Sequence, residues 1–167
     1  MAVTTEDVKK LREESGAGML DCKKALEETK GDYEKARTLL RERGFASAQK
    51  RAERETAEGM VQAYIHHNSR VGALVEINCE SDFVARTEDF KNLVQTVVLQ
   101  VAGADPQYLS AEDIPAGSED DPKEVALLSQ QLLRDDSRTV QDLLTETIAK
   151  TGENIRIKRF ARFELGR

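Results

Sequence analysis

The chain has 167 residues, of which 39% are hydrophobic and 34% are charged, and its formal net charge is −6. A chain of this length and composition folds as a globular protein, and aliphatic residues must build most of its core because aromatic residues make up only 5%. No apolar run is long enough to span a bilayer, and the N-terminus resembles neither a signal peptide nor a transit peptide, so we expect a cytoplasmic protein without membrane contact.

The charge is unevenly distributed along the chain. Basic residues slightly outnumber acidic ones in residues 1–54, whereas acidic residues dominate residues 55–167. An acidic body lacks the basic footprint that neutralises phosphates, so we expect a protein partner rather than direct nucleic-acid binding. Cys22 and Cys79 are far apart and form no CxxC pair, so the sequence does not support a metal knuckle or a disulfide framework.

Residues 4–44 carry the pattern of three short helices. The segment SGAG (residues 15–18) separates the first two, because glycine permits backbone angles that other residues resist. Asp32 is placed to cap the third helix, and Gly44 is placed to end it in a left-handed conformation. We expect these helices to bury a small common core made by Val8, Leu11, Met19, Cys22, Ala25, Leu26, Tyr33, Ala36, Leu39 and Leu40.

Lys23 and Lys24 open the second helix, where a positive charge gains nothing from the helix dipole. A solvated surface is the simplest interpretation of this pair, and a partner contact is the alternative. Gly16 and Gly18 do not indicate a phosphate-binding loop, because the Walker pattern is absent and no strand precedes them. We interpret the two glycines as a tight turn between helices.

Two alternating runs, residues 61–65 and 71–79, flank the turn sequence HHNSR and predict a β-hairpin. His66 and His67 are adjacent, so on a strand they point to opposite faces and do not predict a metal site. Before the hairpin, residues 45–59 are rich in Ala, Glu, Lys and Arg, which favour a solvent-exposed connecting helix. The apolar face of the hairpin is expected to consist of Val61, Ala63, Ile65, Val71, Ala73, Val75, Ile77 and Cys79.

The rest of the chain predicts further helices and a final strand. Thr87 caps a helix that keeps strict helical spacing up to Gly103 and should pack on the hairpin. After a loop with one helical turn at 104–121, two more helices are expected over residues 122–134 and 139–150. The apolar face of the last strand is expected to hold Ile155, Ile157, Ala161, Phe163 and Leu165.

The predicted fold class is therefore α+β. A small three-helix N-terminal domain is followed by a connecting helix and then by a core of antiparallel sheet with helices on one face.

The final strand is crowded by four basic residues, Arg156, Lys158, Arg159 and Arg162. Basic residues interleaved with aromatic ones are able to stack on RNA bases and hold the backbone. We favour the other interpretation, a charged outer sheet face that protects an edge strand from unwanted pairing.

No catalytic, metal-binding or nucleotide-binding pattern occurs, so the residues alone indicate a binding protein rather than an enzyme. One stretch, EINCESDFVAR (residues 76–86), is not fully explained by the predicted strand and helix on either side of it. Ser81 and Asp82 suit a turn between a strand and a helix, but the bulky Phe83 does not. From the residues alone, the simplest interpretation is that Phe83 begins the core behind the helix, with Asp82 as its cap.

Two long segments, LREESGAGMLDCKKAL (residues 11–26) and EINCESDFVAR, resemble the signature stretches of bacterial elongation factor Ts. The closing TGENIRIKRFARFELG is similar to a core strand of that family, so the resemblance covers nearly the whole chain. It implies a guanine nucleotide exchange factor for elongation factor Tu, with no cofactor and with a ubiquitin-associated-type (UBA-like) N-terminal domain.

Two departures from the family are visible. Ser15 and Ser81 stand where the family usually has Thr, which keeps the hydroxyl and loses a methyl group. Longer members contain two related core halves, and this chain has material for about one. Short members are thought to self-associate, so the resemblance implies a homodimer with isologous contacts.

The resemblance also implies which residues bind the GTPase. One group disturbs the magnesium and phosphate site of the GTPase, with Phe83 as an apolar wedge, and comprises Ser81, Asp82, Phe83 and Val84. The second group lies on the N-terminal side and comprises Lys23, Lys24 and Arg51. We expect a GTPase-binding domain at 1–45, a connecting helix at 46–58, and a core for dimerisation and exchange at 59–167.

Two other functions stay open. A protein-binding adaptor without exchange activity would bind its partner equally well with and without GDP. An RNA-associated factor that uses the basic final strand would lose affinity steeply with salt, although the acidic body argues against it.

Overall fold

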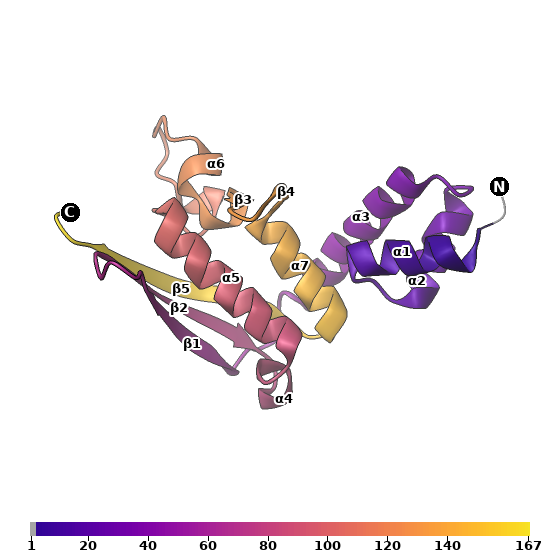
Figure 1. Ribbon diagram of the computed structural model, residues 1–167, viewed down its shortest axis with the longest axis horizontal. Helices are drawn as coiled ribbons and strands as arrows, with labels where there is room; N and C mark the ends of the chain where they lie inside the picture. Colours follow the sequence, from indigo (N-terminus) through magenta and orange to yellow (C-terminus); the bar gives the residue numbers. More distant parts are fainter. Residues whose placement is uncertain (1–2) are drawn as a thin grey trace.

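The computed structural model describes residues 3–167 and has two parts, which lie side by side in Figure 1. The head comprises α1 (Thr5–Ser15), α2 (Met19–Glu28) and most of α3 (Tyr33–Arg51). The body begins at β1 (Glu58–Ile65) and runs to the C-terminus. Among the described residues, no helix combines the length and the apolar character that a membrane crossing requires.

The head is built as the sequence predicts for its first two helices. Thr4 and Asp7 form a capping box at the start of α1, and Gly16 ends it with a φ of 64°. Asp32 caps α3 by accepting a hydrogen bond from the backbone N–H of Lys35. The buried cluster of the head contains Val8, Leu11, Cys22, Ala25, Leu26, Ala36 and Leu40.

The third helix is longer than predicted, and the expected end at Gly44 is wrong. Helix α3 continues through Gly44 to Arg51, so the residues expected to form a separate connecting helix extend α3 instead. Gly44 lies where α3 faces α7 (Val140–Thr151), and a Cβ atom there would be in van der Waals contact with Cγ2 of Thr145, at 3.4 Å. Head and body meet along this contact between α3 and α7.

An ion pair ties the two parts together. Arg41 on α3 donates two hydrogen bonds of 2.9 Å to the carboxylate of Asp142 on α7, whose side chain is only 5% exposed. Asp142 also accepts from the backbone N–H and the hydroxyl of Thr139, the N-cap of α7. The carboxylate is therefore well satisfied although it is buried.

The body contains a three-stranded antiparallel sheet with the strand order β1-β2-β5. The other two strands are β2 (Val71–Cys79) and β5 (Ile155–Glu164), and α5 (Glu88–Ala104) and α7 cover one face of the sheet (Figure 1). The predicted stripe of α5 is buried in the core, with Phe90, Leu93, Val94, Val97, Val98 and Val101 all at most 1% exposed. The α+β architecture is thus confirmed.

The helix predicted over residues 122–134 is wrong. The chain forms short α6 (Pro122–Val125), then the 3₁₀ turn η2 (Leu127–Ser129), and then the two-stranded sheet of β3 (Gln131–Leu132) and β4 (Asp135–Thr139). The helical turn expected between 104 and 121 is η1 (Ala111–Asp113), and α4 (Asp82–Ala85) is an additional short helix.

Buried glutamines explain why this segment is not helical. Gln100 on α5 donates to the carbonyl of Gln131 at 3.0 Å and accepts from the N–H of Leu133 at 3.0 Å. Gln130 donates to the carbonyl of Glu124 at 2.6 Å and to that of Ala104 at 3.3 Å. These long-range bonds to backbone groups override the helical spacing of Val125, Leu128 and Leu132.

The predicted apolar face of β1 is also wrong, and that of β5 is right for Ile155 and Ile157 but wrong after them. In β1, Met60 and Tyr64 pack toward the helices, whereas Val61 and Ile65 are more than 60% exposed on the opposite face. In β5, the register shifts so that Glu76 pairs with Arg159 and Ile77 pairs with Ile157. The skipped residue is Lys158, and one extra residue moves all later side chains to the other face.

The sheet consequently has an apolar outer face. We use this name for the surface of the sheet that faces away from α5 and α7. Its apolar side chains are Val61, Ala63, Ile65, Leu74, Ala161, Phe163 and Leu165. Part of it is a shallow hollow of about 500 Å³ beside the β1–β2 turn.

Candidate partner-binding site

The candidate site is the turn that leads from β2 into α4, with Ser81 as the N-cap. Its hydroxyl oxygen accepts a hydrogen bond from the backbone N–H of Val84 at 3.3 Å, which starts the short helix. The thiol of Cys79 donates to the carbonyl of Ser81 at 3.1 Å. The turn is therefore fixed from its own strand as well as from its helix.

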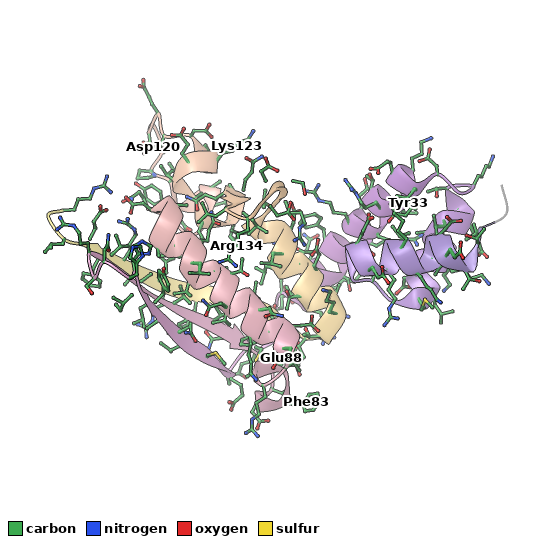
Figure 2. The ribbon with its side chains drawn as sticks, in the orientation of Figure 1. Tyr33, Phe83, Glu88, Asp120, Lys123 and Arg134 are labelled. Carbon is green, nitrogen blue, oxygen red and sulfur yellow. The ribbon has the colours of Figure 1, made fainter. Side chains whose placement is uncertain are left out.

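Phe83 is 76% exposed, and Figure 2 shows it pointing away from the ribbon at the lower end of the body. The interpretation of Phe83 as the first core residue is therefore wrong. The neighbouring Val84 takes that role, because it is 4% exposed and belongs to the main core cluster. Asp82 is exposed and forms a 2.8 Å ion pair with Arg86, one turn along the chain.

A second element holds the turn from behind. Glu153, between α7 and β5, accepts hydrogen bonds from the backbone N–H groups of Glu80 at 3.1 Å and Ser81 at 3.0 Å. It also accepts a 2.5 Å hydrogen bond from the Ser81 hydroxyl. A carboxylate that accepts three hydrogen bonds makes strong, charge-assisted contacts. The exposed aromatic ring thus stands on a rigid base.

The head presents a second exposed group at the start of α2. Lys23 and Lys24 are both exposed, and Lys23 forms only a loose 3.7 Å ion pair with Glu27. Met19 is 41% exposed and Leu20 is 72% exposed. The prediction that Met19 belongs to the core of the head is therefore wrong. The sequence did not indicate that Met19 and Leu20 together form an apolar surface. Only the position of Leu20, outside the predicted apolar stripe of the second helix, gave a sign of it.

Arg51 does not join the group on α2. It lies in the last turn of α3, where its guanidinium donates to the carbonyl of Ser47 at 3.2 Å and to the hydroxyl of the same residue. The side chain therefore folds back on its own helix.

The basic residues of β5 do not form one open surface. Lys158 and Arg159 both pair with Glu76, at 3.3 Å and 2.6 Å, and the hydrogen bond from Arg159 lowers the pKa of that carboxyl. Arg162 is mostly buried and donates to the carbonyl of Ala102 on α5. Glu76 offsets one of the two positive charges that it pairs with, so the strand contributes less to phosphate binding than its four basic residues suggest.

Between residues 3 and 167, no group of three or more His, Cys, Asp or Glu side chains has the arrangement of a metal site. Burial raises the pKa of the Cys79 thiol to about 11, so the thiol is protonated at neutral pH and is a poor nucleophile. The exposed Phe83 is instead typical of a protein–protein contact.

Comparison with known proteins identifies the family of the chain. A sequence model of the family described as "Elongation factor TS" matches residues 24–130 and 80–167. The chain is 48% identical to elongation factor Ts of Thermoanaerobacter sp. (strain X514), over 98% of this chain and 95% of the relative. It is 44% identical to elongation factor Ts of Coprothermobacter proteolyticus, over 99% of this chain and 100% of the relative.

The match to Thermotoga neapolitana elongation factor Ts is 46% identical and covers 99% of this chain and 98% of the relative. The protein is thus a translation elongation factor. Within that class, the chain belongs to the elongation factor Ts family. These alignments span 194 to 196 positions, more than the 167 residues of the chain, so these relatives contain residues without a counterpart here.

Proposed function

We propose that this protein binds elongation factor Tu in its GDP-bound form, disturbs its Mg²⁺ and phosphate site, and promotes release of GDP so that GTP binds. The observation that carries the proposal is the rigidly held, exposed Phe83 at the tip of the body. Membership of the elongation factor Ts family supports this role in translation elongation.

The physical argument is one of thermodynamic linkage. A GTPase holds GDP chiefly through Mg²⁺ and through backbone amides around the phosphates. A partner that binds best when this site is distorted must weaken GDP binding by the same factor by which GDP weakens the partner. Phe83 is the apolar wedge in this proposal, and Asp82 offers a carboxylate for the displaced backbone. The Mg²⁺ belongs to the GTPase, so this chain needs no metal or cofactor.

The proposed role of Ser81 and Val84 is to support the wedge rather than to touch the partner. The Ser81 hydroxyl caps α4, and the buried Val84 side chain anchors the same helix in the core. Together they fix the direction in which Phe83 points.

The head is proposed as a second docking module of the UBA-like type. Its apolar tip of Met19 and Leu20 beside Lys23 and Lys24 suits a partner surface that is apolar with acidic groups at its edge. In Figure 1, α2 of the head and α4 of the body both lie on the lower side of the molecule, which is compatible with one partner contacting both. Arg51 has a lesser place in this proposal because its guanidinium bonds its own helix.

The proposed division keeps the GTPase-binding domain at 1–45, the connection at 46–58 and the core at 59–167. Two separate buried clusters support it, one within Val8–Leu40 and one within Ala73–Ile157. Because the partner serves translation, we place this protein in the cytoplasm within the same proposal.

The proposal includes a homodimer formed through the apolar outer face. Ile65, Phe163 and Leu165 are each more than 60% exposed there, and such a contiguous apolar sheet surface is typical of an interface. We propose that a second copy of the chain covers this face, because sheet-on-sheet packing of two copies buries the same face of both in an isologous contact. In the charged remainder of the face, Glu76 pairs with Lys158 and Arg159 and offsets one of their two positive charges.

Release of a fluorescent GDP analogue from elongation factor Tu tests the exchange function. We expect the protein to accelerate release in proportion to its concentration, and to bind nucleotide-free elongation factor Tu more tightly than the GDP form. An adaptor would bind both forms equally and leave the release rate unchanged, and that result would refute exchange activity. If the protein instead binds RNA, and its affinity for RNA falls steeply with rising salt, the RNA-associated alternative is favoured.

A further inference from the structure

We propose that Glu153 is a positioning residue for nucleotide exchange, because it holds the backbone of the turn that presents Phe83. This inference rests on the proposed function, in which Phe83 contacts the GTPase. Glu153 lies outside the turn itself, between α7 and β5, more than 70 positions along the chain from the residues that it binds.

The hydrogen bonds of Glu153 determine the conformation of the Ser81 side chain. One carboxylate oxygen accepts from the N–H groups of Glu80 and Ser81, and the other accepts the hydroxyl proton of Ser81 at 2.5 Å. With its proton committed to Glu153, the Ser81 oxygen keeps a lone pair free to accept the Val84 N–H. The cap that starts α4 is therefore oriented by Glu153.

Phe83 depends on this cap because it lies in the first turn of α4. The helix has only four residues, Asp82–Ala85, so it has little stability of its own. Loss of the cap would let the turn sample other conformations while Val84 and Ala85 remain buried in the core. The ring would then reach its binding position only in part of the population, which lowers apparent affinity and rate.

The turn that carries Glu153 is itself fixed. Gly152 has a φ of 74°, a left-handed conformation that glycine adopts readily. Asn154, which follows Glu153, is 2% exposed, and its backbone N–H donates to the Glu80 carboxylate at 2.6 Å. Its side-chain amide donates to the carbonyls of Ala52 at 3.4 Å and Arg54 at 2.8 Å, just after α3.

These contacts fix the position of Glu153. They also connect the turn that presents Phe83 to the segment that joins head and body. Arg54 adds a 3.4 Å ion pair to the Glu80 carboxylate. The hydrogen-bonded groups thus come from the segment after α3, from the end of β2 and from the α7–β5 turn.

The test compares Glu153→Gln with Glu146→Gln. Glutamine has the same shape, but one of its two positions is an NH₂ donor that cannot accept a hydrogen bond. Glu146 is a matched control, because it lies on α7 and is partly buried, but pairs with Arg138 at 2.8 Å instead of with the turn. Ser81→Ala provides a second, milder variant that removes only the hydroxyl.

Two readouts are measured. In the free protein, hydrogen–deuterium exchange of the peptide spanning residues 80–84 should be about tenfold faster in Glu153→Gln than in the wild type or Glu146→Gln. With elongation factor Tu, acceleration of GDP release should fall about tenfold in Glu153→Gln and change less than twofold in Glu146→Gln. Ser81→Ala should lie between them, and thermal unfolding should confirm that each variant is folded.

Combination with Phe83→Ala separates this inference from the proposed function. If Glu153 acts through Phe83, Glu153→Gln should have less than a twofold effect in the Phe83→Ala background. The same tenfold loss in both backgrounds would overturn the positioning role while leaving exchange activity in place. Full exchange activity of folded Glu153→Gln would overturn it as well. Full activity of Phe83→Ala alone would instead refute the wedge, and the role of Glu153 with it.

Discussion

Phe83 and Val84 are neighbours in the chain, but the structure gives them opposite surroundings. Val84 is 4% exposed in the core, and Phe83 is 76% exposed at the tip of the body. A short helix turns successive side chains by about 100°, so one residue can anchor the turn while the next one is presented to a partner. The sequence pattern alone favoured a buried Phe83, because an exposed aromatic side chain is expected only where a partner covers it.

Cys79 permits a residue-scale prediction about pH. Burial raises the pKa of its thiol from 9.0 to about 11 in the folded protein. The folded state therefore retains this proton where the unfolded state loses it, so the stabilising contribution is complete below pH 9 and is lost as pH rises toward about 11. Urea unfolding at pH 8 and pH 10 should show a larger loss of stability in the wild type than in Cys79→Ala, and equal losses would contradict the prediction.

At the scale of elements, the segment from α6 to β4 depends on two buried glutamines. Gln100 and Gln130 are 1% and 3% exposed, and they satisfy backbone groups of a segment that has few regular hydrogen bonds of its own. Hydrogen bonds to buried backbone groups are costly to lose, because the partner groups stay desolvated. The segment is therefore held by α5 rather than by its own helical propensity.

Gln100→Met should test this support. Methionine has a similar volume but leaves the carbonyl of Gln131 and the N–H of Leu133 without their side-chain partner. We expect the free energy of unfolding in urea to fall by about 2 kcal/mol. Gln95→Met, an exposed position on the same helix, should change it by less than about 0.5 kcal/mol. Similar effects at both positions would indicate that the network does not stabilise the segment.

The elements that sequence predicted well are those with local signals. Helices α1, α5 and α7 each have a Thr N-cap and an apolar stripe, and both features act within a few residues. The errors arose where long-range contacts decide. The clearest example is Lys158 in β5, whose bulge reverses the face of Phe163 and which no local pattern marks. The extension of α3 through Gly44 likewise accompanies a long-range contact, because α3 packs on α7 beside Thr145.

For the candidate site, the sequence located the turn but not how it is held. Ser81 and Asp82 have ordinary turn chemistry, and the family resemblance was needed to assign a role to Phe83. Glu153 binds this turn from more than 70 positions away, so its contribution became evident only in the structure. The apolar tip at Met19 and Leu20 was also missed, because helical spacing does not show which apolar residues lie at the edge of the core.

At the scale of the whole molecule, the apolar outer face leads to a prediction about oligomeric state. In sedimentation velocity, the wild type should have about twice the 18.7 kDa mass of one chain at micromolar concentration. Ile65→Glu should be monomeric, because it places a charge on the apolar outer face. Leu133→Glu, at an exposed apolar residue outside this face, should remain a dimer. A monomeric wild type, or a dimeric Ile65→Glu variant, would contradict the proposed interface.

The most direct measurement of the central claim is GDP release from elongation factor Tu with Phe83→Ala beside Leu133→Ala. Both residues are exposed apolar side chains, at 76% and 59%, so neither substitution should unfold the protein. If Phe83 is the wedge, its loss should cost about 2 kcal/mol, or roughly a 30-fold slower exchange, while Leu133→Ala stays within twofold of the wild type. Wild-type exchange by folded Phe83→Ala would show that the exposed ring does not act on the nucleotide site.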